Sequence, residues 1–324
     1  MITINKYESR ELNEWDEFID ASNNGTIFQK QSFITYHIDR KFVDHSLIIK
    51  NNSNILAVFP AAIKNNVLYS HPGSSYGGFV IAKDVEFSTI NDIILELDNY
   101  CINNSFKSIF LINSPSIYHK ELDCSLDFLL QWNRFYQKEL YISHAVNIKK
   151  VTALSDLLAK RKRRYLNNNS EFNTLEFKES NEFDEFYRIL LASKERFKTT
   201  PTHSLEELVR LKKTFSDDIK LLLTIKEGKI IGGSLVFFAN NKIALVFYNT
   251  ILEEFKNSQI AMLQLYKCME ISKKYGYHSV DFGVSHTPEA NDPLAPKLSL
   301  IHFKEQFGAK GVLRVAYQKD YSGS

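Results

Sequence analysis

The chain has 324 residues, enough for one large domain or two domains of ordinary size. Hydrophobic residues make up 44% and charged residues 24%, the proportions of a globular protein and not of a disordered or fibrous one. Its 40 basic and 38 acidic residues give a net charge of +2, so the balance indicates no general attraction to nucleic acid or to an anionic membrane.

The N-terminus and the cysteines bear on localisation and redox chemistry. The opening stretch MITINKYESRELNEW lacks the basic start and apolar core of a signal peptide, and no apolar run reaches the length of a membrane span. Cys101, Cys124 and Cys268 lie far apart, without the spacing of a metal site or a redox motif. We therefore expect a cytoplasmic protein with buried free thiols, no membrane span, no metal and no nicotinamide cofactor.

In chain order, the first half predicts helices, then antiparallel strands, then a helix and a strand. Polar turns divide the stretch from Ser46 into three apolar runs, the pattern of three strands joined by tight turns. A probable strand, Leu140–Ile148, ends this half. The predicted helices are Glu11–Ser22, Ser32–Arg40 and Thr89–Cys101, and the strand after the last helix is Ser108–Ile112.

The second half repeats this order about 175 residues later. Three apolar runs separated by EGK and ANN turns begin at Ile219, and a long helix with apolar residues at i, i+3, i+4 and i+7 follows them. We predict two copies of one α/β domain, at residues 1–148 and 149–324, although a chance likeness of generic strand patterns is the alternative. The predicted helices are Leu154–Asn167, Phe183–Phe197, Ser204–Thr214, which begins with the capping-box pair Ser204 and Glu207, and Ser258–Lys274, and the strand His278–Phe282 follows.

Four stretches of the second half resemble the Fem family of peptidoglycan interpeptide-bridge aminoacyltransferases and related GNAT-like acetyltransferases. KRKRRYLNNN (160–169) is similar to the basic helix that opens the family's second domain, and SKERFKTTPTHS (193–204) to a helix end with an arginine, here Arg196. VDFGVSH (280–286) resembles the strand and turn after the long helix, and LSLIHFKEQFGAK (298–310) the closing helix with its F-K-x-x-F-G pattern. The resemblance implies an α/β (α+β) fold of two tandem GNAT-like domains with mixed, largely antiparallel sheets.

The resemblance also implies an acyltransferase or aminoacyltransferase that forms an amide on an amine of a cell-envelope precursor. The acceptor would be a peptidoglycan precursor or a nucleotide-linked sugar, and the donor would be acyl-CoA or aminoacyl-tRNA, bound as a co-substrate and not as a tight cofactor. The glycine-rich pyrophosphate loop of ordinary GNAT enzymes is replaced by EFKNSQIAML, which favours tRNA. The long helical hairpin of some Fem ligases is absent too, which leaves acyl-CoA open.

Catalytic candidates lie near the end of the predicted strand 278–282, where α/β folds place ligands. Asp281 or His286 could take the proton of the attacking amine, and Ser285 beside them is a substrate-binding candidate. Tyr248 is the third catalytic candidate, because the resemblance implies that its strand edge faces the reacting centre. The alternatives are a turn cap for Asp281, a solvated loop position for His286 and a core position for Tyr248. No G-x-S-x-G elbow occurs, so we expect direct attack without a covalent intermediate.

Two sets of cations are candidates for phosphate contacts. The resemblance implies that Arg196 and Lys304 hold a phosphate of the acceptor or the donor. Neighbouring residues of a helix point about 100° apart, so the five cations from Lys160 to Arg164 cover every side of it and cannot all serve one site. For donor binding, and for a tRNA backbone above all, we predict Arg161, Arg163 and Arg164. The alternative for every one of these cations is a solvated surface charge.

The loop YSHPGSSYGGFV (69–80) has three glycines within six residues. Such a loop can cradle a phosphate, admit a substrate close to the backbone or simply bend the chain. It runs into the apolar segment 79–82 and not directly into a helix, which argues against the phosphate cradle. We therefore predict that His71, Ser75 and Tyr76 line the acceptor side of the site.

Two other classes of function are open at this point. A non-catalytic binding protein built on a degenerate GNAT pair is favoured by the missing pyrophosphate loop. A nucleic-acid-binding protein built around the basic run fits the balanced net charge poorly. The transferred group, the acceptor and the oligomeric state do not follow from the sequence.

Overall fold

The computed structural model describes residues 1–37, 42–70, 72–168, 170–196, 199–287 and 290–321. It divides into two compact units, here called unit 1 (Met1–Tyr141 with Leu313–Ser324) and unit 2 (Ile142–Val312). The chain passes from unit 1 to unit 2 within strand β9 (Tyr136–Asn147) and returns within β15 (Lys310–Asp320). The boundary predicted from the sequence, at residues 148–149, would place the C-terminal end of the chain in the second domain. In the structure, Ala316–Asp320 pair with a strand of unit 1.

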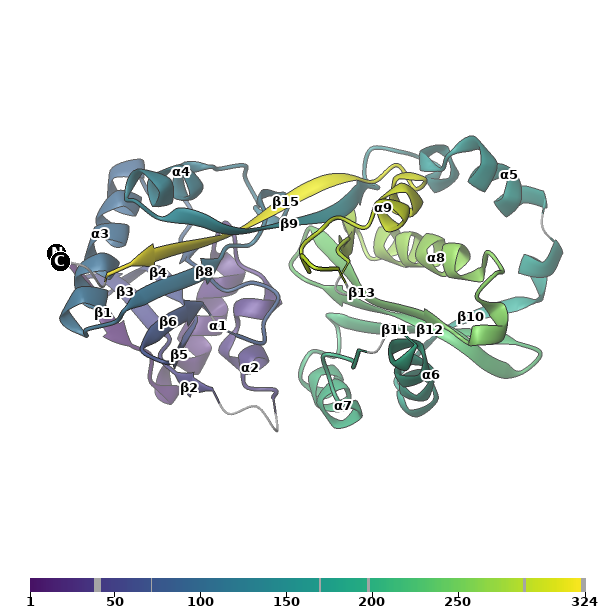
Figure 1. Ribbon diagram of the computed structural model, residues 1–324, viewed down its shortest axis with the longest axis horizontal. Helices are drawn as coiled ribbons and strands as arrows, with labels where there is room; N and C mark the ends of the chain where they lie inside the picture. The colour runs from purple at the N-terminus through teal and green to yellow at the C-terminus, as the bar shows by residue number, and fades with distance from the viewer. Residues whose placement is uncertain (38–41, 71, 169, 197–198, 288–289, 322–324) are drawn as a thin grey trace. The chain divides into compact units, whose positions relative to one another are not determined.

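Unit 1 contains two sets of strands, which can be followed in Figure 1. The first set is a four-stranded antiparallel sheet, and the second is antiparallel except where β6 runs parallel to β8. The first set is, in order, β1 (Ile2–Lys6), β3 (Leu47–Asn51), β4 (Asn54–Phe59) and β7 (Val80–Ile81). The second is β2 (Val43–Asp44), β5 (Ala61–Lys64), β6 (Val67–Ser70), β8 (Ser108–Ile112) and the end of β15.

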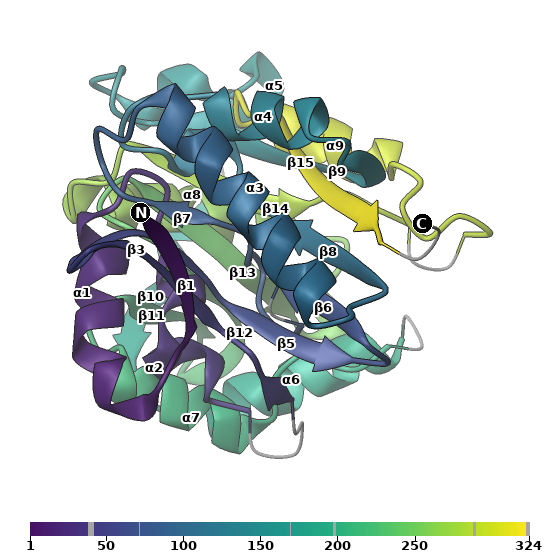
Figure 2. The ribbon, with the colours of Figure 1, turned by 90° about the vertical axis from the view of Figure 1, so that its left-hand side faces the viewer.

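The first sheet is covered on both faces, which Figure 2 shows from the side of unit 1. Side chains alternate along β3, so Ile48 packs with Trp15 of α1 (Leu12–Ala21) on one face. Leu47 and Ile49 point to the other face and join the core that α3 (Phe87–Asn103) closes. All three residues are fully buried, which explains why this strand reads as a continuous apolar run.

The apolar run 54–64, which the sequence predicts as one strand, is two strands. It breaks at Pro60, and β4 and β5 on either side of this residue join different sets of strands. Proline has no N–H to donate to a ladder, so a central strand is interrupted where it occurs.

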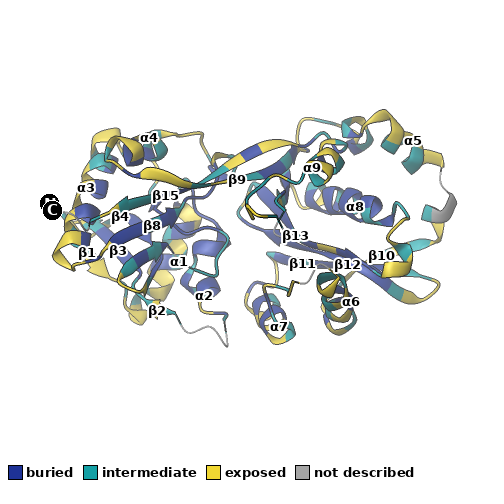
Figure 3. Ribbon diagram, viewed as in Figure 1, coloured by how far each residue is buried: buried dark blue, intermediate teal, exposed yellow. Residues whose placement is uncertain are grey.

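In the described part of unit 2 the strands form one sheet, in which β13 and β14 are the one parallel pair of neighbours. Helix α8 (Ile260–Lys274) covers one face of the central strands, and α6 (Asp184–Glu195) and α7 (Leu205–Thr214) cover the other (Figure 1). The central strands are buried, and α5 (Lys160–Asn168) is largely exposed (Figure 3). The strand order is β10 (Leu175–Ser180), β11 (Ile219–Lys226), β12 (Lys229–Phe238), β13 (Ile243–Ile251), β14 (Ser279–Val284) and β9.

The predicted α/β architecture with mixed, largely antiparallel sheets is confirmed in both units. In each unit antiparallel strands precede a long helix, α3 or α8, and the strand after the helix runs parallel to an earlier strand. In unit 2 this earlier strand is β13, directly before α8, whereas in unit 1 it is β6, and β7 lies between β6 and α3 in the chain. The helix expected at 32–40 is much shorter than predicted, α2 (Gln31–Ile34), and residues 38–41 lie outside the described part. Among the described residues, no helix combines the length and the apolar character needed to cross a bilayer.

Candidate active site

The parallel pair β13–β14 lies at the centre of the candidate site. Ile243–Leu245 pair with Ser279–Asp281, and the pairing stops there although both strands continue. On the other side of β13, Leu235 of β12 pairs with Tyr248 and Val236 with Val246, so Phe247 is the extra residue of a β-bulge. A bulge takes the N–H of its extra residue out of the ladder. These two features make β13 the strand of unit 2 whose main chain is best placed to meet a ligand.

Asp281 lies on β14 and is 1% exposed. Its Oδ1 accepts the N–H of Gly283 at 2.8 Å, and the hydroxyl of Ser143 lies 3.5 Å from its Oδ2. Gly283 has a φ of +73°, a backbone conformation that favours glycine. The carboxylate therefore holds the turn at the end of β14, which is the capping role considered as an alternative.

Lys304 comes from α9 (Leu298–Glu305) and is 4% exposed, so the idea of a solvated surface charge is wrong for this residue. Its ammonium donates to the carbonyls of Gly283 at 2.7 Å and Val284 at 2.9 Å and to the hydroxyl of Ser285 at 2.9 Å. An ammonium has three N–H groups, so all of its donors are engaged inside the protein. Burial lowers the pKa of Lys304 to about 8, and the negative charge of Asp281 acts in the opposite direction.

Ser285 and two histidines lie beside this ammonium. Ser285 is fully buried, and its hydroxyl lies 3.3 Å from Nδ1 of His144. Burial, and then the charge of Lys304, lowers the pKa of His144. His286 is half-buried and its Nε2 accepts the backbone N–H of Ile142 at 3.2 Å. The structure thus brings Asp281, Ser285 and Lys304 together, with His286 at the edge of the group.

Tyr248 lies within β13 and not at its end, because the strand continues to Ile251. The residue is 5% exposed, and its hydroxyl accepts the N–H of Thr202 at 3.0 Å and lies 3.1 Å from Nδ1 of His203. Burial raises the pKa of the Tyr248 hydroxyl. Tyr248 is therefore a protonated group that fixes the loop before α7.

Lys194 was missed by the sequence reasoning. Its ammonium lies 5.8 Å from the centre of the Tyr248 ring, and burial lowers its pKa. Arg196, two residues further on, forms an ion pair with Glu253 and donates to Ser193 Oγ at 3.0 Å. The sequence feature that could have indicated Lys194 is its position two residues before Arg196, near the end of the same helix. Only the arginine belongs to the family pattern.

The basic run on α5 splits into two kinds of side chain. Arg163 donates to the carbonyls of Asp156 at 3.2 Å and Leu158 at 3.3 Å. Arg161 and Arg164 are exposed. A further member of the run, Lys162, donates to Gln259, the residue that precedes α8, and lies 5.6 Å from the centre of the Phe303 ring.

In the glycine-rich loop of unit 1, Tyr76 and Ser75 are less exposed than we expect for residues that line a binding site. Tyr76 is 4% exposed, and its ring meets those of Phe28 and Tyr118 at 5.7 and 5.1 Å. Ser75 is half-buried, and its carbonyl accepts Nη1 of Arg314 at 3.3 Å. His71 lies outside the described residues. Since Gly78 has a φ of +66°, the expected role of the glycines in a tight bend fits the backbone.

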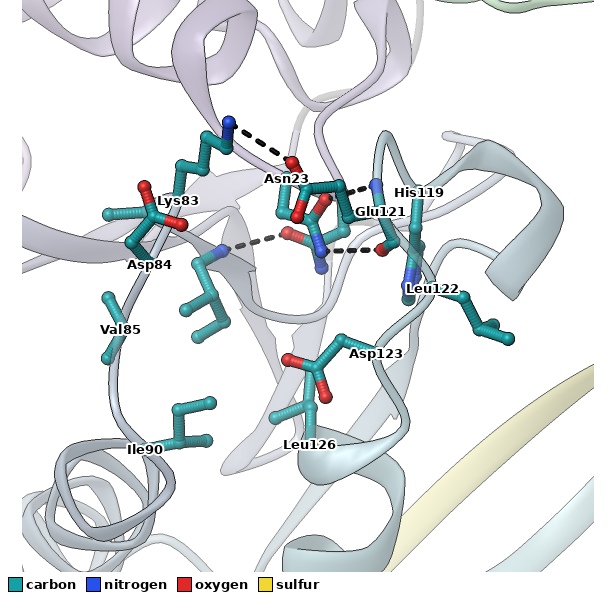
Figure 4. Close-up of a pocket in the computed structure, with 13 residues that line it drawn as sticks. Asn23, Lys83, Asp84, Val85, Ile90, His119, Glu121, Leu122, Asp123 and Leu126 are labelled. Atoms are coloured by element: carbon teal, nitrogen blue, oxygen red, sulfur yellow. Dashed lines mark hydrogen bonds and ion pairs between the residues drawn. The ribbon is translucent and has the colours of Figure 1, made fainter.

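A small pocket of about 160 Å³ lies near the start of α3, between the segment after β7 and the segment before α4 (Ser125–Trp132), as Figure 4 shows. Charged side chains dominate its polar lining, and Lys83 forms an ion pair with Glu121 at 3.1 Å. The lining residues are Asn23, Asn24, Ile81, Ala82, Lys83, Asp84, Val85, Ile90, His119, Glu121, Leu122, Asp123 and Leu126.

The two buried cysteines supply no activated nucleophile. All three cysteines are free, but Cys124 is exposed, so the expectation of three buried thiols is wrong for this one. Cys101 and Cys268 are fully buried, and burial raises the pKa of both thiols to about 12. A thiol with so high a pKa is a poor nucleophile, which agrees with transfer by direct attack.

Comparison with known proteins finds a family model that matches part of the chain and solved structures with a similar fold. Residues 158–291 match the family model for the acetyltransferase (GNAT) domain. The crystal structure of FemX is similar over 98% of this chain and 97% of that one, with a TM-score of 0.71 and 13% identity. No curated protein sequence matches the chain.

Two further solved structures are similar over nearly the whole chain. One is the C-terminal domain of a putative lysylphosphatidylglycerol synthetase from Agrobacterium fabrum, with 10% identity, a TM-score of 0.60 and coverage of 97% of this chain and 93% of that one. The other is a tandem GNAT protein from the clavulanic acid biosynthesis pathway, with 9% identity, a TM-score of 0.56 and full coverage of both chains. At these identities the likeness concerns the fold, and it confirms the predicted pair of GNAT-like domains.

Proposed function

We propose that this chain is a Fem-like acyltransferase of the GNAT fold and that it forms an amide on an amine of a cell-envelope precursor. The observation that carries this proposal is the bulged strand β13, whose pairing with β14 stops after three residues. An acyl group that enters beside β13 would meet main-chain donors there, and backbone N–H groups are well suited to stabilise an oxyanion. The match to the GNAT domain covers this part of the chain.

In the proposed reaction, the acceptor nitrogen attacks the acyl carbon of a thioester or ester. The new bond is the amide C–N bond, and the bond that breaks joins the acyl carbon to the sulfur of CoA or to the ribose oxygen of tRNA. The N–H freed by the bulge at Phe247 stabilises the oxyanion of the intermediate. The proton of the amine leaves through water to Nε2 of His286, which must first give up the hydrogen bond that it accepts from the N–H of Ile142. Asp281 is buried and is kept at the β14 turn by its bond to Gly283.

The remaining groups position the reactants. Lys304 and Asp281 hold the end of β14, and Tyr248 holds the segment that leads into α7. We assign Lys194 and Arg196 to an anionic group of the acceptor, a phosphate or a carboxylate. Ser75, Tyr76, Ser285 and His71 stay predictions for acceptor binding.

The donor brings phosphate groups whether it is acyl-CoA or aminoacyl-tRNA. We place these phosphates at the N-terminus of α8, where the helix dipole favours anions and the exposed cations Arg161 and Arg164 are carried by the neighbouring α5. Arg163 stays a prediction for the same role. Both donors occur in the cytoplasm, which is where we infer that the protein acts.

Donor binding by the full chain tests the proposal. Thermal unfolding is followed with acetyl-CoA, with CoA and with a mixed pool of aminoacyl-tRNA, since a ligand that binds the folded state alone raises the unfolding temperature. Protection by micromolar CoA would assign acyl-CoA, and a salt-sensitive tRNA complex would assign aminoacyl-tRNA. If neither donor binds, and no radiolabelled acyl group from either reaches a peptidoglycan precursor or an amino sugar nucleotide, the proposal is wrong.

A further inference from the structure

We propose that unit 2 binds a phosphomonoester in a groove between α7 and the strands β10 and β11. Two adjoining cavities of about 470 and 260 Å³ form this feature, here called the lysine groove, and they share Asn181 and Lys212. The larger cavity is lined by Asn181, Phe183, Val209, Lys212, Lys213 and Ser216, and the smaller by Glu179, Ser180, Asn181, Lys212, Lys220 and Leu221. None of these residues belongs to the β13–β14 site, so this proposal does not depend on the proposed function.

Two ammonium groups are held close together in the groove. Nζ of Lys212 donates to the carbonyls of Ser216 at 2.6 Å and Ile219 at 2.8 Å, and Nζ of Lys220 donates to the same carbonyl of Ser216 at 3.4 Å. Two like charges on one carbonyl oxygen repel each other. Burial, and then the charge of Lys220, lowers the pKa of Lys212. An anion that lies between the two ammonium groups relieves this repulsion.

The lysines of the groove are not neutralised by ion pairs. Across the described part of the chain, no carboxylate lies within ion-pair distance of Lys212, Lys213 or Lys220. Glu179 lines the smaller cavity, and its carboxylate accepts the hydroxyl of Tyr275 at 3.1 Å. Asp217 and Glu179 raise the pKa of Lys212 and so offset part of the lowering by burial and Lys220. The lining of the two cavities has three lysines and one carboxylate, Glu179, so it keeps an excess of positive charge.

The lining also indicates the chemical class of the ligand. A dianionic phosphate matches two or three ammonium point charges, and the side chains of Ser180 and Asn181 bring hydrogen-bonding groups to the smaller cavity. The larger cavity has an apolar wall in Val209, which is 49% exposed, and Phe183. It has room for the organic part of a small phosphate ester, such as a mononucleotide or a sugar phosphate.

Calorimetric titration of the full chain with inorganic phosphate and with AMP, at constant ionic strength, tests the proposal. We expect saturable binding of both, weakened about tenfold by Lys213→Gln or Lys220→Gln and unchanged by Lys229→Gln, an exposed lysine outside the groove. Lys212→Gln is avoided because the ammonium of Lys212 also donates hydrogen bonds to the carbonyls of Ser216 and Ile219, so its loss could destabilise the fold. Binding of phosphate should strengthen from pH 5.5 to 7.5, as its second proton is lost with a pKa of about 6, whereas binding of sulfate should not.

Three results would overturn the proposal. The first is the absence of saturable heat with either ligand. The second is an equal loss of affinity in Lys229→Gln, which would mean diffuse attraction to surface charge. The third is a loss caused by Arg161→Gln with Arg164→Gln but not by Lys220→Gln, which would place the phosphate at α8. Failure of donor transfer with intact phosphate binding in the groove would refute the proposed function alone.

Discussion

The two units differ most at the N-termini of their long helices. In unit 1, the start of α3 has carboxylates around it: Glu86 precedes the helix, and Asp84, Glu121 and Asp123 line the adjacent pocket (Figure 4). In unit 2, the residue before α8 is bonded by Lys162, and other cations of α5 are exposed. A helix N-terminus carries a partial positive charge that attracts anions. In unit 1, carboxylates of the protein lie near this partial positive charge, whereas in unit 2 cations lie near it. Unit 2 is therefore the unit suited to a phosphate-bearing donor.

A second difference concerns one lysine in each unit, the half-buried Lys319 of unit 1 and the buried Lys304 of unit 2. In unit 1, Lys319 forms an ion pair with Asp98, and the hydroxyl of Tyr321 donates to the same carboxylate at 2.7 Å. In unit 2, Lys304 is bonded to the turn after Asp281 and not to a carboxylate. The first arrangement anchors the last strand, and the second fixes main chain at the proposed site. Two copies of a fold have thus diverged in the placement of charge more than in the order of their elements.

The largest expected effect comes from Lys304→Met. Loss of the side chain leaves two carbonyls and a hydroxyl without their donor, and relief of the buried charge offsets part of this cost, so we expect destabilisation of about 2 kcal/mol. Displacement of the β14 turn should lower turnover about 100-fold. Lys319→Met is the matched control in unit 1, with a similar loss of stability in urea unfolding and unchanged turnover. Equal loss of turnover in both folded variants would remove the distinction between the two lysines.

The pH dependence of stability separates Lys304 from the other lysines. Its pKa is about 8 in the folded protein and about 10.5 when unfolded, so between these values the unfolded chain binds a proton that the folded chain has released. Stability from this group therefore rises with pH from about 8 to 10.5, by about 3 kcal/mol in total, and is lost as the pH falls through 8. Urea unfolding at pH 7.5 and 9.5 should show this rise in the natural protein and not in Lys304→Met. An equal change in stability between the two pH values in both proteins would contradict this prediction.

Charge changes at the two helix ends should have unequal effects on the donor. Arg161→Glu with Arg164→Glu should weaken donor binding about tenfold and reduce its salt dependence. In unit 1, Asp84→Asn with Asp123→Asn should leave the donor dissociation constant unchanged. A stronger effect of the unit 1 pair would mean that the donor binds at α3.

The smallest effect expected is that of Ser204→Ala. Its hydroxyl accepts the N–H of Glu207 at 3.1 Å, and the Glu207 carboxylate accepts the N–H of Ser204 at 2.8 Å. Loss of this cap should cost about 1 kcal/mol, seen as a lower urea midpoint. Donor affinity should not change, because α7 lies on the opposite face of the sheet from α8 (Figure 1).

The local features of this fold could be predicted from the sequence. The capping box of Ser204, the long helix α8 and the strand β8 follow from patterns a few residues long, and each occurs close to its expected bounds. The break at Pro60 could also be predicted, because proline interrupts a strand. The prediction of three strands in each half of the chain left it out.

The site was less predictable because it depends on contacts between distant residues. Asp281 and Ser285 are predicted together at one strand end, but nothing in the sequence indicates that Lys304 bonds the turn between them. The β-bulge at Phe247 and the cation Lys194 leave no local pattern at all, since each is defined by the element that lies against it.

Strand β15 has a consequence for the order of events on the ribosome. Its residues Ala316–Asp320 pair with β8 and contribute Lys319 to the ion pair with Asp98, so unit 1 needs them to be complete. These residues are synthesised after the whole of unit 2. Unit 1, which emerges first from the ribosome, is therefore completed last, because β8 lacks its neighbouring strand until all of unit 2 has been synthesised.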